Sequence, residues 1–483
     1  MTTYDRTWLK EQLLDRFIRY VKIDTTSDRQ IEEIPSTPGQ WDLLNLLKKE
    51  VLELGIEDIT LNSNGYLIIK VPARGLPAGG TPAEGSSAGG PSAQAAPAKG
   101  RPDSGPAAQG TSAGATPAKG KPASGSTAQA TPASGTSAGG ASGEASQTTI
   151  GLMAHVDTAS DVSGKNVKPQ VFENYQGGDL SIGNGLVLKA DENPMLAESF
   201  GDTIITSDGS TLLGADDKAG VAEIMTALTW LMNHPDVSHG PLEIIFTPDE
   251  ETGKGMNLFP LDSLEAECCY TFDGGERGTI EGECFNAYAA RILFTGNVVH
   301  LGIARGKLVN AVTMASHFVS LLPRNESPEA TDGRYGYYTP FEIRGDLEKA
   351  ELNVYLRDFE SDGMERRLAV LQQLAEAVEA VFPGGKVKVE SKRLYTNMRD
   401  YINREPRIME MLEEAIRRTG VEPERRIIRG GTDGSRLSEM GIPTPNVFTG
   451  GYNFHSRLEW ASLNTMVEAA ETAINLVRLW GEG

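Results

Sequence analysis

One long segment of the sequence lacks the residues that build a hydrophobic core. Between Pro77 and Thr149 there is no Val, Ile, Leu, Met, Phe, Trp, Tyr or Cys, and Ala is the only hydrophobic residue. Such a segment cannot bury enough apolar surface to offset the entropy lost on ordering it. Its prolines recur every 20 residues, as at Pro77, Pro97 and Pro117. A solenoid can have such a period, but no repeat here has an apolar residue to stack inward, so we expect a disordered, flexible low-complexity insert over residues 77–149.

Cysteine, basic charge and long apolar runs are also scarce, and each shortage excludes a class of protein. The three cysteines, Cys268, Cys269 and Cys284, form no Cys-x-x-Cys pair, which excludes thiolate zinc ribbons and disfavours a disulfide framework. Acidic residues outnumber basic ones by 66 to 45, a balance that nucleic acids and anionic membranes do not favour. No run of 18 apolar residues exists, and the N-terminal segment is charged and amphipathic. We therefore expect a cytoplasmic protein with no nucleic-acid and no membrane partner.

Outside the insert, predicted helices and strands alternate along the chain. Apolar spacing indicates helices over 8–21, 41–54, 216–232, 407–418 and 464–480, and short buried strands over 66–71, 150–156, 242–246, 269–272 and 445–448. This alternation predicts an α/β sheet. Residues 285–396 read as a smaller unit of strands and two helices, so we expect a larger domain in two parts, 1–284 and 397–483, interrupted by a smaller α+β domain.

Histidine and carboxylate residues follow several of the predicted strands. His155 and Asp157 end one strand and share a face of it, where a carboxylate can fix the tautomer of a ligating imidazole. Three consecutive acids, residues 249–251, follow the next strand, and Asp273 ends another. Each motif alone has an ordinary explanation, such as a polar pair at a strand end. Together they favour a metal site, because ligands of open α/β sheets bind at the carboxyl ends of strands. A site of His and carboxylates without Cys suits a catalytic zinc ion or a pair of metal ions.

The order of these motifs resembles that of a known family. They are HVDT (155–158), TLLGADDKAG (211–220), TPDEETGKG (247–255), TFDGG (271–275), RGGTDGSRLSEMGIP (429–443) and FTGGYNFHS (448–456). They resemble the bacterial tripeptide aminopeptidases of the dizinc aminoacylase and carboxypeptidase clan, over essentially all of the chain except the insert. The resemblance implies an α/β dizinc exopeptidase-type catalytic domain and a ferredoxin-like lid/dimerisation domain at 285–396.

The resemblance also implies a set of metal ligands, divided between two ions. His155 and Asp273 would hold one zinc ion, Glu251 and His455 would hold the other, and Asp216 would bridge both. Cobalt or manganese could occupy the same ligands.

Four further residues match positions of the family pattern. Asp157 would orient His155, and Glu250 would be the general base that activates the attacking water. His300 would stabilise the oxyanion, and Arg357 would receive the terminal carboxylate of the substrate, for which a guanidinium fork is suited. An ordinary ion pair between Arg357 and a neighbouring acid is the alternative.

Three functions follow from this reading. The first is an aminopeptidase that uses two Zn²⁺ per subunit to remove the N-terminal residue of tripeptides, and the resemblance implies a homodimer formed through the smaller domain. The second keeps the metal site but acts on dipeptides or N-acyl amino acids. The third is a non-catalytic scaffold that works through the repeat insert, for which no PxxP run with aromatic or basic flanks is evident.

Overall fold

A mixed eight-stranded sheet organises the larger part of the chain in the computed structural model, which describes residues 4–75 and 148–482. The predicted insert lies outside the described residues, apart from its last two positions. The strands, in spatial order, are β1 (Ile59–Leu61), β2 (Leu67–Val71), β8 (Leu242–Thr247), β3 (Ile150–His155), β9 (Cys268–Gly274), β16 (Asn446–Phe448), β10 (Thr279–Cys284) and β15 (Glu424–Ile428). The α/β architecture expected from the alternating pattern is confirmed.

The four central strands β8, β3, β9 and β16 run parallel to one another. Every residue of β3 and β8 is buried, as in a parallel sheet that is covered on both faces. Alternate residues of these strands face two different cores. Leu152 and Ile244 belong to one core, and Met153 and Ile245 belong to the other. Because the four strands are parallel, their carboxyl ends lie at one edge of the sheet.

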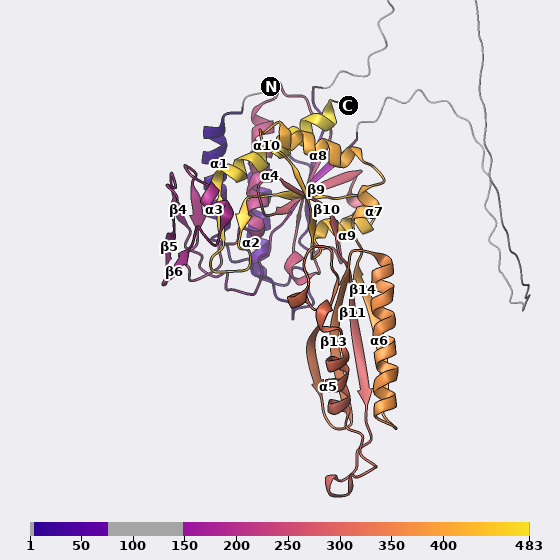
Figure 1. Cartoon of the computed structure of the whole chain (residues 1–483). Helices are drawn as coiled ribbons and strands as arrows, with labels where there is room; N and C mark the ends of the chain where they lie inside the picture. The colour runs from indigo at the N-terminus through magenta and orange to yellow at the C-terminus, as the bar shows by residue number, and fades with distance from the viewer. Residues whose placement is uncertain (1–3, 76–147, 483) are drawn as a thin grey trace, which may run out of the picture. The chain divides into compact units, whose positions relative to one another are not determined.

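Most helices pack on one of these two faces (Figure 1). The helices outside the smaller unit are α1 (Arg6–Tyr20), α2 (Pro38–Glu53), α3 (Pro194–Glu198), α4 (Ala215–Asn233), α7 (Arg399–Ile402), α8 (Arg407–Arg417), α9 (Asp433–Glu439) and α10 (Leu463–Gly481). Residues of α1, α2, α4, α8 and α10 share one core with the sheet, whereas Leu437 of α9 lies in the core of the opposite face. Local sequence explains several helix starts, because Asp5 and Ser462 accept hydrogen bonds from the first amides of α1 and α10, and Pro38 occupies the first turn of α2.

A second, antiparallel sheet lies in the part of the chain predicted to form the smaller domain. Its elements, in chain order, are β11 (Asn286–Thr295), α5 (Ala311–Leu321), β12 (Tyr337–Gly345), β13 (Lys349–Asp358), α6 (Ser361–Val381) and β14 (Lys386–Tyr395). The spatial order β12-β13-β11-β14 makes this a split βαβ arrangement. Its core is separate from those of the main sheet and includes Ile292, Phe294 and Phe318. We call this unit the lid.

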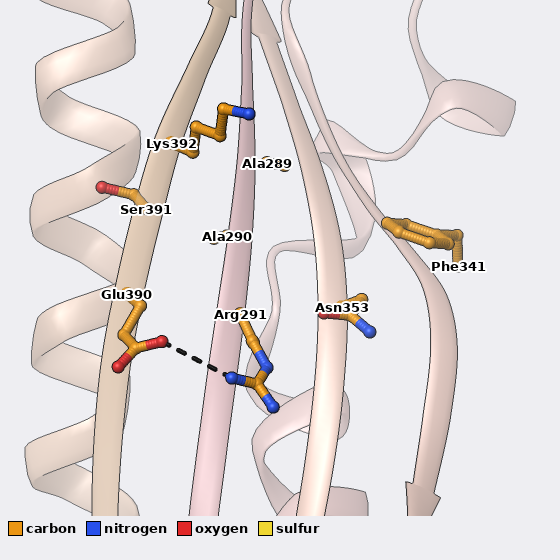
Figure 2. Close-up of a pocket in the computed structure, with 8 residues that line it drawn as sticks. All are labelled: Ala289, Ala290, Arg291, Phe341, Asn353, Glu390, Ser391 and Lys392. Atoms are coloured by element: carbon orange, nitrogen blue, oxygen red, sulfur yellow. Dashed lines mark ion pairs between the residues drawn. The ribbon is translucent and has the colours of Figure 1, made fainter. Parts of the chain in front are cut away.

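The face of the lid sheet turned away from α5 and α6 carries a hollow of about 300 Å³ (Figure 2). Its charged residues partly satisfy one another, since an Arg291 nitrogen lies 3.8 Å from a Glu390 oxygen. Phe341 of the edge strand β12 lines the same hollow and is about half exposed. Strand β12 was not expected, and its ladder shifts register at Pro340, which interrupts the pattern that identifies a strand.

Two small sheets complete the described residues. One contains β17 (Gly451–Tyr452), β18 (Trp460–Ser462), β7 (Ile204–Thr206) and β4 (Gln170–Phe172), and the other pairs β5 (Leu180–Gly183) with β6 (Leu186–Leu188). Among the helices of the described residues, none is both long enough and apolar enough to cross a membrane.

Candidate metal centre

Five side chains from five separate segments meet at the carboxyl edge of the parallel strands. They form two groups of potential metal ligands, one of His155, Asp216 and Asp273, the other of Asp216, Glu251 and His455. Within each group the ligand atoms lie within 4.8 Å of one another, and Asp216 belongs to both. These are the five residues predicted as ligands, so the structure brings all of them together.

The parallel sheet explains why three of these residues are neighbours. His155 is the last residue of β3, Glu251 lies in the 3-10 turn η1 (Glu250–Thr252) after β8, and Asp273 lies near the end of β9. Adjacent parallel strands deliver these side chains to the same edge. His455 comes from the loop between β17 and β18, where its backbone adopts a left-handed conformation with φ of 59°. Non-glycine residues seldom adopt this conformation, and they do so mainly where the surrounding structure imposes it.

Each histidine faces two carboxylates with its Nε2 atom. The Nε2 of His155 lies 3.0 Å from an Asp216 oxygen and 3.4 Å from an Asp273 oxygen. The Nε2 of His455 lies 3.2 Å from the other Asp216 oxygen and 2.9 Å from Glu251 Oε1. Asp216 therefore presents one oxygen to each imidazole, which is the position required of a bridging ligand.

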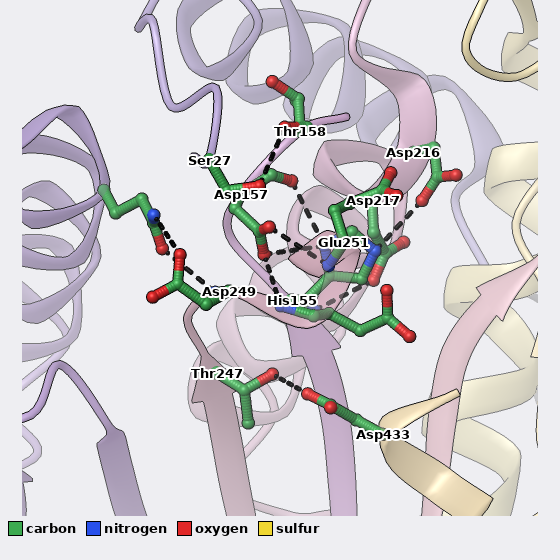
Figure 3. Close-up of polar contacts among 12 residues, drawn as sticks. Ser27, His155, Asp157, Thr158, Asp216, Asp217, Thr247, Asp249, Glu251 and Asp433 are labelled. Carbon is green, nitrogen blue, oxygen red and sulfur yellow. Dashed lines mark hydrogen bonds and ion pairs between the residues drawn. The ribbon is translucent and has the colours of Figure 1, made fainter. Parts of the chain in front are cut away.

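Asp157 holds both His155 and the turn that follows β8 (Figure 3). One of its oxygens lies 3.3 Å from His155 Nδ1 and leaves Nε2 directed at the cluster. Its two oxygens also accept the backbone N–H groups of Glu250, at 3.0 Å, and of Glu251, at 3.2 Å. Asp157 is fully buried, so these bonds are protected from water. The contact between Asp157 and the turn was not expected from the sequence, because residues 157 and 250 follow different strands.

The cluster is strongly negative, and burial governs its protonation. Burial raises the pKa of Glu250 well above its ordinary value, and it raises the pKa of Glu251 to about 7. Burial also opposes ionisation of Asp216, but hydrogen bonds with His155 and His455 lower its pKa below the usual range. The pKa of His455 rises to about 11 because of its bonds with Asp216 and Glu251. The shifts show that this space favours positive charge.

The donor set fits metal ions. Glu251 Oε1 is buried, and apart from its contact with His455 Nε2 it has no polar partner among the described residues. A buried carboxylate oxygen directed at an imidazole and a second carboxylate is suited to a cation. Two imidazoles and three carboxylates, with no thiolate, form a ligand set that zinc accepts and that leaves room for a two-metal site.

The two predicted site residues of the lid, His300 and Arg357, form their contacts with residues outside the five-residue cluster. His300 is exposed, and its Nδ1 accepts the backbone N–H of Gly302 at 3.2 Å. Arg357, on β13, donates to the carbonyl oxygen of Leu356 at 3.0 Å, and its guanidinium lies over the rings of Tyr355 and Tyr395. Within residues 4–75 and 148–482, no carboxylate forms an ion pair with Arg357. The alternative of an ordinary ion pair with Asp358 or Glu360 is therefore wrong, because those acids pair with other arginines.

Three buried acids support the site without having been assigned a role from the sequence. Asp249 precedes the turn of Glu250 and Glu251 with φ of 57°, and it accepts hydrogen bonds from the backbone N–H of Ser36 at 2.7 Å and from Gln40 Nε2 at 2.8 Å. Asp433 accepts the hydroxyl of Thr247 at 2.6 Å, and burial raises its pKa to about 7 (Figure 3). Glu459 bonds to the turn that carries Asp216. Asp249 and Asp433 stand inside recognisable motifs, whereas no spacing signal marks Glu459.

A pocket of about 280 Å³ lies beside the segments that carry two of the ligands. It is lined partly by Gly275, which follows Asp273, and by Asn453 and Phe454, which precede His455. Other lining residues are apolar or aromatic, including Met195, Tyr452 and Trp460.

Comparison with known proteins agrees with this fold and cluster. The family described as Peptidase family M20/M25/M40 matches residues 208–479. Peptidase T of Geobacillus thermodenitrificans is 38% identical over 474 residues, covering 98% of this chain and 99% of its own length. Peptidase T of Bacillus licheniformis is 38% identical over 476 residues, covering 98% of this chain and 100% of its own length. The chain therefore belongs to peptidase family M20/M25/M40, and its relatives place it in the peptidase T group.

Solved structures of this fold cover nearly the whole chain. Aminopeptidase PepT from Bacillus cereus superposes with a TM-score of 0.66 at 19% identity, covering 98% of both chains. A tripeptidase from Staphylococcus aureus superposes with a TM-score of 0.67 at 16% identity, covering 98% of this chain and 99% of its own. At these identities the likeness shows the shared fold.

Proposed function

We propose that this chain is a metal-dependent aminopeptidase that removes the N-terminal residue of tripeptides with two zinc ions bound in the cluster. The observation that carries the proposal is the convergence of His155, Asp216, Glu251, Asp273 and His455 at one edge of the sheet. The relatives named Peptidase T, similar over nearly their full length, support the same reaction. The buried free thiols of all three cysteines are in keeping with a reducing, cytoplasmic setting.

The ligands divide into two sets that share one residue. His155 and Asp273 would hold one ion, Glu251 and His455 the other, and Asp216 both. Two divalent cations held there would polarise the scissile carbonyl and lower the pKa of the attacking water.

Glu250 acts as the general base. It stands next to a ligand in the same turn, and its backbone is fixed by Asp157. From this position its carboxylate can take a proton from the attacking water and deliver that proton to the leaving amine.

Arg357 recognises the free carboxylate at the far end of the substrate. Its guanidinium has no acidic partner in the described part of the chain, and aromatic rings flank it. The ring of Tyr395 also lies against Gly431, where an added Cβ would be 2.5 Å from the ring, two residues before Asp433. Arg357 is therefore linked through one aromatic side chain to the loop that ends at Asp433, one of the buried acids that support the cluster.

His300 would stabilise the oxyanion of the tetrahedral intermediate. Its exposed imidazole has to approach the cluster for that role, so movement of the lid or contact with a second chain is required. We further propose that the lid mediates homodimerisation. Its edge strand β12 exposes Phe341 and Ile343, and apolar side chains on an open sheet edge favour association.

The decisive test combines metal analysis with a peptide panel. The purified protein should contain two metal ions and should cleave tripeptides far better than dipeptides, tetrapeptides or N-acetylated amino acids. Glu250→Ala should abolish cleavage while retaining the fold and both ions. Full activity of Glu250→Ala would refute the mechanism, and a preference for dipeptides or N-acyl amino acids would refute the substrate class.

A further inference from the structure

Glu459 is a buried carboxylate that bonds only to backbone amides. It lies just before β18 and is 1% exposed. One oxygen accepts the N–H groups of Leu213 and Gly214, both at 2.8 Å, and the other accepts the N–H of Asp216 at 3.2 Å. Within the described residues it forms no ion pair with a basic side chain. Three backbone amides therefore bond to its two oxygens, an arrangement that requires a hydrogen-bond acceptor at each oxygen.

In the described part of the chain, the N–H groups of Leu213, Gly214 and Asp216 have no hydrogen-bond partner other than Glu459. Gly214, the N-cap residue of α4, adopts φ of 85° and has no side chain to cap the helix, and Asp217 Oδ1 accepts only from an amide further along, that of Gly220 at 3.3 Å. The backbone of Asp216 and Asp217 departs from helical angles, so the first residues of the element lie outside the regular helical ladder. Buried N–H groups need hydrogen-bond acceptors, and Glu459 is the acceptor for three such groups. Asp216 therefore owes its backbone position to Glu459.

The same residue ends the loop that carries His455. Within this loop, the Asn453 amide donates to the Leu458 carbonyl at 3.2 Å, and the Ser456 hydroxyl donates to the Asn453 carbonyl at 2.7 Å. The backbone N–H of Glu459 in turn bonds to the Ser456 carbonyl at 3.3 Å. The loop is thus tied to itself, and the Glu459 side chain ties it to the turn of Asp216. Two proposed ligands, from segments far apart in sequence, share one anchor.

We propose that Glu459 is a positioning residue that sets the distance between Asp216 and His455. Through this distance it sets the affinity of the cluster for the metal ion that Glu251 and His455 hold. The proposal rests on the proposed function, in which both residues are ligands. The position requires a side chain that accepts hydrogen bonds at both of its terminal atoms, as a carboxylate does. The isosteric amide of Gln does not meet this requirement, because its NH₂ group would face an N–H donor.

The test is a Zn²⁺ titration of chelator-treated protein, followed by calorimetry with a competing chelator. Glu459→Gln should bind one of the two Zn²⁺ ions about 10- to 100-fold more weakly than the wild type, the range found for residues that orient metal ligands. Glu459→Asp keeps the charge but is one methylene shorter, so it should also bind more weakly. If Glu459→Gln does not fold, the Zn²⁺ affinity of Glu459→Asp tests the proposal.

Glu243→Gln is a matched control. Glu243 is also 1% exposed and accepts backbone N–H groups, from Glu265 at 3.0 Å and Ala266 at 2.8 Å, but it lies at the start of β8, the opposite end of the strand from the cluster. It should lose thermal stability and keep wild-type Zn²⁺ affinity. Wild-type affinity in the Glu459 variants, or an equal loss in Glu243→Gln, would overturn the inference. A wild-type protein that binds no Zn²⁺ would instead refute the proposed function itself.

Discussion

Replacing Arg357 with Ala offers a direct measure of how the substrate is recognised. In the structure its guanidinium has a carbonyl oxygen and two aromatic rings as neighbours but no carboxylate among the described residues. An unpaired, half-buried guanidinium between Tyr355 and Tyr395 is prepared for an anionic ligand, because no existing ion pair has to be broken. We therefore expect Arg357→Ala to weaken the use of substrates with a free C-terminal carboxylate.

The expected magnitude follows from the type of bond that is lost. A hydrogen bond to a charged group contributes about 1.5–3 kcal/mol. Since about 1.4 kcal/mol corresponds to a tenfold change in rate, kcat/KM for a tripeptide should fall by about 10- to 150-fold. A tripeptide whose C-terminus is amidated lacks the carboxylate. In the wild type it should be cleaved less efficiently than the free acid by about the same factor.

The assay compares the free acid and the amide of one tripeptide in two proteins. In Arg357→Ala the ratio of their kcat/KM values should approach one, because neither substrate has a partner at that position. Arg291→Ala is the control, since Arg291 lies on the same sheet, is exposed and pairs with Glu351 and Glu390. It should leave the ratio unchanged. An unchanged ratio in Arg357→Ala would refute the assigned role, even if overall activity fell.

Three further outcomes are expected. Removing metal with a chelator should lower the melting temperature in scanning calorimetry, by the equivalent of about 3 kcal/mol if the free ion was present at 100 times its dissociation constant, and re-added Zn²⁺ should restore it. Burial raises the pKa of Glu281 to about 7. The folded state therefore binds the proton of this carboxyl more tightly than the unfolded state does, and the stability that the protonated carboxyl contributes is lost as the pH rises through 7. Glu281→Gln should therefore stabilise the protein at pH 8, on the order of 3 kcal/mol, and have little effect at pH 4, as measured by urea unfolding; a pH-independent difference would contradict this. Phe318→Ala should destabilise the lid by about 3–5 kcal/mol, because Phe318 is fully buried and packs edge-to-face on Phe294, and retained near-UV circular dichroism and an unchanged urea midpoint would argue against that packing.

Helices and buried strands were largely predictable because their patterns are local. The expected helix over 8–21 corresponds to α1, and the expected strand over 150–156 corresponds to β3. Apolar spacing reports which face of an element is buried, whatever that face packs against. Elements without such a pattern were not expected, as with β12, which contains Pro340, and with the short strands β4 to β7. Their pairing comes from partners distant in the chain.

The residue types of the metal cluster and their places at strand ends could be read from the sequence alone, because a parallel sheet collects the carboxyl ends of its strands at one edge. Which carboxylate faces which imidazole could not be derived from spacing and was implied only by resemblance. The tertiary structure decides it, since Asp216 reaches both His155 and His455 only through the packing of distant segments. The supporting contacts were also beyond the sequence. Glu459 has no motif of its own, because its partners are backbone amides, which every residue except proline possesses, and only the folded chain selects the three that it binds.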